Sequence, residues 1–151
     1  MTSIFDSATF LDATTTEALV KRPPVPAGTE LIGILGEPKG RAGEKDGKSW
    51  TAVDFPVEVD LSAYPDIAKL VNTQTVLFKL GIMLDTNEGG MIDWSTGKNG
   101  RLRKVREALG MNVAGQPFSI RAMQGRPIRF VVTHREYEGE IFDEIGAVAK
   151  A

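Results

Sequence analysis

The twelve residues from Trp50 to Leu61 alternate between the two sides of an extended chain, and this run constrains the fold most. From Val53 onward one side is apolar and consists of Val53, Phe55, Val57, Val59 and Leu61. A period of two over this length is typical of a β-strand with one buried face. Pro56 lies on the polar side and favours a sheet edge or a bulge, because proline has no backbone N–H. The chain is therefore expected to fold around a half-buried sheet.

Similar runs predict further strands over residues 28–35, 75–85, 128–137 and 141–148. Between the first two strands, Lys39–Lys48 contains three glycines and four basic residues, which predict a long flexible hairpin loop.

One helix is expected within the second half of the chain. Asn99 is placed to cap it, Leu102, Val105 and Leu109 form an apolar stripe, and Gly110 is placed to end it. Strands that follow one another through short connections favour antiparallel pairing. The order predicts a mainly β fold with one helix, an OB-fold-like five-stranded antiparallel barrel with the helix between strands three and four. A small β-sandwich with one helix would give a similar order.

The first 27 residues differ from the rest and are interpreted as an N-terminal arm that precedes a domain over residues 28–151. Pro23, Pro24 and Pro26 favour an extended spacer. Thr14-Thr15-Thr16-Glu17 fits a capping box, which predicts a helical turn over 17–20. The arm either contacts a partner or a second copy of the chain, or is a poorly ordered terminus.

Composition excludes several classes of protein. The chain has no cysteine and one histidine, which excludes disulfide frameworks, thiolate nucleophiles and histidine-rich metal sites within one chain. It has no long apolar run and no basic, apolar leader, so neither a membrane span nor a secretory signal is expected. We predict no cofactor and no metal.

No catalytic motif is complete. His134 lies in a predicted strand and no Gly-x-Ser-x-Gly elbow accompanies it. Ser95–Lys98 ends like a phosphate loop but has the wrong glycine spacing. Asp54, Glu58 and Asp60 share one strand face, where carboxylates are either solvated or able to hold Mg²⁺. A metal-dependent nuclease that uses these carboxylates is therefore kept only as an alternative. A protein without enzymatic activity is expected.

Charge is unevenly distributed along a chain of net charge −2. Residues 98–135 carry nine basic side chains and one acidic one, whereas residues 54–97 carry two basic and seven acidic ones. A local basic region can hold a polyanion even when the whole protein is nearly neutral.

Single-stranded nucleic acid is held by basic grooves for the backbone and aromatic faces for the bases. Trp50 lies out of phase with the apolar side of its strand, beside the basic loop, and Trp94 lies in a glycine-flanked loop. The predicted nucleic-acid-binding residues are Lys39, Arg41, Lys48, Trp50, Lys79, Trp94, Arg126, Arg129, Arg135 and Tyr137. A loop anchor is the alternative role for Trp94, and a hairpin closure that for Tyr137.

Three stretches carry a family resemblance: Pro24–Thr29, Asn99–Met111, and Gln124–Gly139 with the closing Ile145–Val148. Across residues 24–148 the chain resembles phage-encoded OB-fold single-stranded-DNA-binding proteins. The resemblance implies sequence-tolerant binding of single-stranded DNA in replication and recombination, in the cytoplasm of a bacterial host. It also implies phage or host replication and recombination proteins as candidate partners, with a homodimer as a further candidate.

The C-terminus departs from the pattern of bacterial single-strand binders, which end in an acidic tail with an apolar tip. This chain ends Gly146-Ala147-Val148-Ala149-Lys150-Ala151. Recruitment of host proteins through such a tip is therefore not expected. The alternative to DNA binding is a β-rich structural or adaptor protein of a phage particle, with the arm contacting a neighbour.

Overall fold

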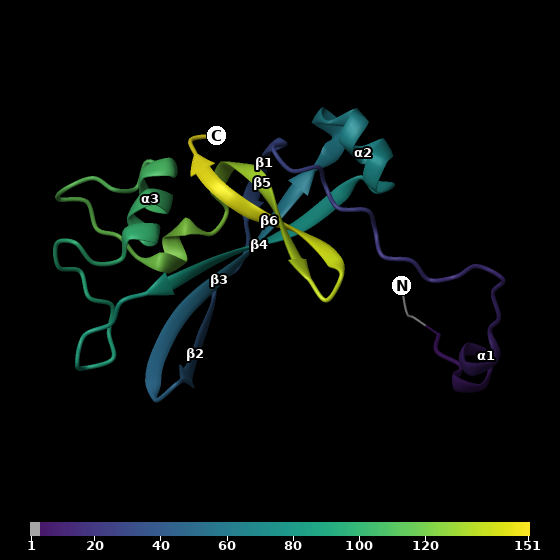
Figure 1. The fold of residues 1–151 in the computed structure, drawn as a ribbon, viewed down its shortest axis with the longest axis horizontal. Helices are drawn as coiled ribbons and strands as arrows, with labels where there is room; N and C mark the ends of the chain where they lie inside the picture. The colour runs from purple at the N-terminus through teal and green to yellow at the C-terminus, as the bar shows by residue number, and fades with distance from the viewer. Residues whose placement is uncertain (1–3) are drawn as a thin grey trace.

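Within residues 4–151, which the computed structural model describes, the chain forms one antiparallel sheet of six strands and three short α-helices (Figure 1). The strands are β1 (Glu30–Leu35), β2 (Lys39–Lys45), β3 (Lys48–Asp60), β4 (Thr75–Leu84), β5 (Pro127–Tyr137) and β6 (Glu140–Ala149). The helices are α1 (Ser7–Asp12), α2 (Pro65–Val71) and α3 (Gly100–Ala108), and the short 3-10 turns are η1 (Leu61–Ala63) and η2 (Ile120–Met123). The predicted mainly β, antiparallel fold is confirmed.

The thirteen-residue strand β3 is the centre of the sheet. β2 and β1 pair with successive parts of one edge of β3, and β4 runs along the other edge. β1 then continues the sheet to β5 and β6. The break between β1 and β2 lies at Gly36, whose N–H donates to the Pro56 carbonyl at 2.7 Å. A Cβ at Gly36 would lie 2.7 Å from Pro56 Cγ, so glycine permits this close approach.

The alternating residues of β3 and β4 bury one face of the sheet, as predicted. Phe55, Val57 and Val59 are fully buried, and Phe78 of β4 meets Phe130 of β5 edge to face with ring centroids 5.1 Å apart. Complete burial of an apolar side chain of this size stabilises the fold by roughly 1.5–3 kcal/mol. This inner face therefore forms the hydrophobic core of the fold.

The predicted helix forms as α3 and covers one end of the core. Leu102 and Val105 are buried, and α3 packs against both β4 and β6. Those two strands approach within 8 Å between Cα atoms but form no ladder with each other. The sheet is accordingly open.

Within residues 28–151, the prediction of five strands and one helix is corrected at two places. Lys39–Lys45 forms β2 instead of a loop, because the Asp46-Gly47 turn folds it back on β3; both turn residues have positive φ, 54° and 77°. Pro65–Val71 forms α2, which begins with a proline at its first turn and ends at Asn72 in the left-handed region.

The segment before β1 has two parts. Residues 4–20 are exposed throughout, and a helix forms over Ser7–Asp12, not over the predicted residues 17–20. From Lys21 onward the chain contacts the sheet: Val25 is fully buried, and the Gly28 N–H donates to the Val132 carbonyl at 2.8 Å. Figure 1 shows α1 well away from the sheet.

Candidate nucleic-acid interface

The outward-pointing side of β2, β3 and β4, here called the open face, is exposed to solvent. On β2 and β3, strand register pairs Lys39 with Asp54 and Lys45 with Lys48, and places Arg41 and Trp50 between these two pairs. The open face is completed by the outward-pointing residues of β4, which include Leu77, Lys79 and Met83. Leu77 is 63% exposed and Met83 57% exposed, which shows that no element of the described chain covers them. Five of the ten predicted binding residues, Lys39, Arg41, Lys48, Trp50 and Lys79, thus come together on one surface.

Trp50 is held at the basic end of the open face. Its ring lies against the backbone of Gly43 on β2, where a Cβ would be 2.6 Å from the ring atom Cζ2. The Arg41 guanidinium lies 5.2 Å from the ring centroid. A hollow of about 480 Å³ opens beside the ring, lined also by Lys45, Lys48 and Met83. The ring is thereby held in place while part of its surface remains accessible.

The cations of this hairpin differ in how they are compensated. Arg41 forms a two-pronged ion pair with Asp54, its second nitrogen lying 3.2 Å from Oδ1. Lys39, Lys45 and Lys48 have no ion-pair partner within residues 4–151. Lysine charges that are exposed and uncompensated are the ones available to phosphate.

The opposite end of the open face is apolar and acidic. Ile32, Ile34, Pro56 and Leu77 line a groove of about 640 Å³, with Glu58 and Asp60 at its side. The open face thus grades from a basic end near Trp50 to an apolar groove near α2.

The three carboxylates of β3 are not arranged as a metal site. Asp54 is engaged by Arg41, and Asp60 accepts a hydrogen bond from the Ser62 N–H at 2.9 Å. The hydrogen bonds from Ser62 lower the pKa of Asp60. Within the part of the chain that the structure describes, no three His, Asp or Glu side chains are close enough to hold one metal ion. Asp54 thus acts as a cross-strand partner of Arg41, and Asp60 as the cap of the following turn.

The remaining predicted residues lie elsewhere. Arg129 of β5 faces the same side as its register partner Ile32, but Glu30 lies 3.9 Å from it and the Lys150 carbonyl accepts from it at 3.2 Å. Arg126 is exposed in the turn before β5.

Arg135 and Tyr137 occupy the β5–β6 hairpin. Arg135 forms an ion pair with Glu144 and lies 6.0 Å from the Tyr137 ring centroid. His134 lies on β5 and is exposed, with Nε2 2.7 Å from the Val25 carbonyl oxygen.

Trp94 lies in the loop between β4 and α3, outside the open face. It is 58% exposed and meets Phe118 edge to face, with ring centroids 6.0 Å apart.

Sequence reasoning missed Lys45 and the apolar side chains Leu77 and Ile34 as candidates. The alternation of β4 already placed Leu77 beside Lys79 on the outer side, so that signal was present. Lys45 was missed because its strand was expected to be a loop.

No known protein family matches this chain, and no curated protein is similar to it in sequence. No helix among residues 4–151 has the length and apolar character needed to cross a membrane.

Proposed function

We propose that the protein binds single-stranded DNA without strong sequence preference, along the open face. The observation that carries this proposal is the combination at its basic end: a fixed, accessible Trp50 ring beside lysines that lack acidic partners. Bases stack on such rings, and lysines contact the phosphates between them. Met83 beside the ring, and Leu77 at the other end of the open face, offer further contact to bases.

We also propose that the fold is a distorted OB barrel. In support, α3 packs against both β4 and β6, at the place where a barrel would close. The OB fold binds oligonucleotides on the face of its second and third strands, which correspond here to β3 and β4. A role in phage replication or recombination, in the cytoplasm of a bacterial host, follows from the resemblance alone.

The test is an anisotropy titration of fluorescein-labelled oligo-dT of about 30 nucleotides, followed together with tryptophan fluorescence. Four lysine contacts, from Lys39, Lys45, Lys48 and Lys79, give a log–log salt slope of about −3, so affinity should fall roughly 50-fold between 50 and 200 mM salt. Trp50→Ala should weaken binding by about 1–3 kcal/mol. No binding at low salt, by a folded protein, contradicts the proposal.

A matched control separates the open face from charge in general. Lys69 of α2 is exposed like Lys79 but does not lie on the open face. Lys79→Ala should reduce the salt slope by about 0.7, whereas Lys69→Ala should leave it unchanged.

A second candidate function, a structural or adaptor protein of a phage particle, is favoured by the exposed N-terminal segment. Large apolar side chains there include Ile4, Phe5, Phe10 and Leu11, each at least 65% exposed. Exposed apolar groups of this density are typical of protein contacts. This alternative predicts concentration-dependent assembly in sedimentation, lost on deletion of residues 1–20, together with no DNA binding.

A further inference from the structure

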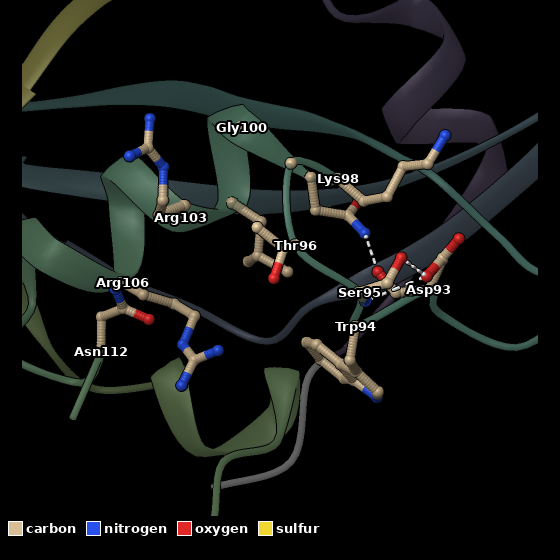
Figure 2. A pocket seen from close by; sticks show the side chains of 12 residues that line it. Asp93, Trp94, Ser95, Thr96, Lys98, Gly100, Arg103, Arg106 and Asn112 are labelled. Atoms are coloured by element: carbon tan, nitrogen blue, oxygen red, sulfur yellow. Dashed lines mark hydrogen bonds between the residues drawn. The ribbon is translucent and has the colours of Figure 1, made fainter. Parts of the chain in front are cut away.

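A pocket of about 520 Å³ lies beside α3, between the loop Asp93–Asn99 and the first turns of the helix (Figure 2). Its volume is within the range of small-molecule sites. Its position follows from the sheet: Leu84, at the end of β4, pairs with Thr51, the residue after Trp50. The loop that forms the pocket therefore begins next to the basic end of the open face.

The lining of this pocket is strongly basic. Lys98, Arg103 and Arg106 line it, and Asp93 is its one carboxylate. Asp93 accepts hydrogen bonds from the hydroxyl and the backbone N–H of Ser95, and these bonds, together with the nearby charge of Lys98, lower its pKa. The pocket thus combines three cations with an anion that is engaged locally.

The three cations of the pocket differ in the contacts that they make. Arg106 donates to the Met111 carbonyl at 3.1 Å and lies 3.9 Å from the Phe118 ring centroid, so it is part of the framework. Arg103 is well exposed, and its nearest carboxylate, on Glu107, is 4.0 Å away. Lys98 has no ion-pair partner among residues 4–151. Arg103 and Lys98 are therefore the cations available to a ligand.

Trp94 supplies an aromatic surface at the same pocket. Arg106 stacks on Phe118, and Phe118 meets the Trp94 ring nearly perpendicularly, at 85°. This chain of contacts supports Trp94 through an edge-to-face contact, while more than half of its surface remains exposed. A supported but accessible tryptophan can stack on a planar ligand.

We propose that this pocket binds one nucleotide unit, with the base on Trp94 and the phosphate attracted by the exposed Lys98 and Arg103, whose side chains point to opposite sides of the helix start (Figure 2). The proposal deepens the proposed function and rests on it, since the unit would belong to a single strand continuing from the open face beyond Met83. An anionic group alone would use the cations but leave Trp94 without a role, and a neutral aromatic would leave the cations without one. A nucleotide uses both.

The test isolates Trp94 spectroscopically. The chain has two tryptophans, so Trp50→Phe leaves Trp94 as the sole strong emitter. In this background dTMP should quench the fluorescence saturably, whereas thymidine and inorganic phosphate should bind more weakly. Lys98→Ala and Arg103→Ala should each weaken dTMP binding several-fold. Lys104→Ala is the matched control, because Lys104 lies on the same helix but lines a different hollow, and it should change nothing.

Binding of oligo-dT distinguishes this inference from the proposed function. Trp94→Ala should weaken oligo-dT binding roughly fivefold or more, the loss expected for one stacked base. If oligo-dT binds while Trp94 is unquenched by both it and dTMP, the inference is wrong and the open-face proposal stands. If dTMP quenches Trp94 but oligo-dT does not bind, the open-face proposal is wrong and the continuation of the strand with it. Equal effects of Lys104→Ala and Arg103→Ala on dTMP binding would also overturn the inference.

Discussion

The β2–β3 and β5–β6 hairpins are built alike but present opposite chemistry. Each closes through a two-residue turn whose residues both have positive φ: 54° and 77° at Asp46-Gly47, 50° and 79° at Glu138-Gly139. Two-residue turns of this kind match the twist of paired strands. Turn geometry therefore does not decide what either hairpin can bind.

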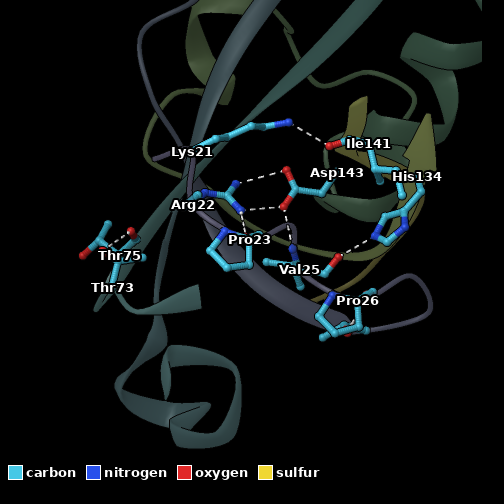
Figure 3. A network of polar contacts seen from close by, with 11 residues as sticks. Lys21, Arg22, Pro23, Val25, Pro26, Thr73, Thr75, His134, Ile141 and Asp143 are labelled. Carbon is cyan, nitrogen blue, oxygen red and sulfur yellow. Dashed lines mark hydrogen bonds and ion pairs between the residues drawn. The ribbon is translucent and has the colours of Figure 1, made fainter. Parts of the chain in front are cut away.

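The two hairpins differ in net charge and in whether another segment of the chain binds to them. Residues 39–50 carry four cations and two carboxylates, a net +2, whereas residues 134–144 carry one cation and five carboxylates, a net −4. The second hairpin is also held by the N-terminal segment: Arg22 and the Val25 N–H both bind Asp143, and Lys21 donates to the Ile141 carbonyl (Figure 3). An exposed arginine is thus a poor indicator of a binding site unless its acidic neighbours are known.

The largest expected effect comes from removing the uncompensated lysines of the first hairpin. The triple variant Lys39→Ala/Lys45→Ala/Lys48→Ala should reduce the salt slope of oligo-dT binding by about 2. If the variant and the wild type bind equally at 1 M salt, a slope change of 2 makes the variant bind about 100-fold more weakly at 0.1 M salt. This loss of affinity corresponds to roughly 3 kcal/mol. Arg135→Ala on the second hairpin should leave the slope unchanged. Equal losses from the two variants would show that the hairpins do not differ in the way proposed.

Much of the sheet could be predicted because the core face repeats every second residue. The run from Val53 to Leu61 locates β3 whatever its partners are, since burial of one face fixes the register. β2 was missed because Lys39–Lys45 has no apolar face of its own; its strand conformation depends on pairing with β3. The short helix α2 was missed although its proline start and Asn72 end are visible in the sequence.

The candidate site was predictable only in part, for a related reason. Trp50 and Lys79 were placed correctly on the outer side because alternation assigns each residue of a strand to a face. The pairing of Arg41 with Asp54, or of Arg135 with Glu144, depends on cross-strand register, which single-sequence patterns do not give. Arg135 and Tyr137 were consequently grouped with Trp50 because alternation placed them on an outer strand face, although it does not show what lies beside that face.

The next effect concerns how firmly the second hairpin is held. Burial alone raises the pKa of Asp143, but hydrogen bonds from Arg22 and the Val25 N–H outweigh it and lower that pKa below 3.8. A lowered pKa stabilises the fold above about pH 4, and this contribution is lost as pH falls through the folded-state value. At pH 7, Asp143→Asn should reduce the free energy of unfolding by about 1–2 kcal/mol, because it removes the ion pair with Arg22. The loss is no larger because Arg22 is partly exposed and solvent weakens this ion pair.

Urea unfolding at pH 7 and pH 3 checks this effect, with oligo-dT affinity measured in parallel. The advantage of the wild-type protein over Asp143→Asn should be smaller at the lower pH. Asp12→Asn, in the exposed helix α1, is the control and should match the wild type. A large loss of DNA affinity in the Asp143→Asn variant, while it remains folded, would mean that the second hairpin does take part in binding.

A smaller effect tests how Trp50 is held. A Cβ at Gly43 would lie 2.6 Å from the ring, so Gly43→Ala must move the ring away from its position. A displacement of this kind costs about 0.5–1.5 kcal/mol, which should appear in oligo-dT affinity and in the Trp50 emission maximum. Gly40→Ala, on the same strand with open space around it, is the matched control. Identical emission from both variants would show that Gly43 does not position the ring.

The smallest effect comes from releasing an arginine on each hairpin. Asp54→Asn removes the charge that compensates Arg41 on the open face, and Glu144→Gln does the same for Arg135 on the second hairpin. Each gains one uncompensated cation, but only Arg41 lies beside Trp50. Asp54→Asn should therefore tighten oligo-dT binding up to about fivefold at 0.1 M salt and increase the slope by about 0.7, whereas Glu144→Gln should change neither. If the two variants tighten binding equally, net charge and not the open face controls the affinity, because the two substitutions alter net charge by the same amount at different places.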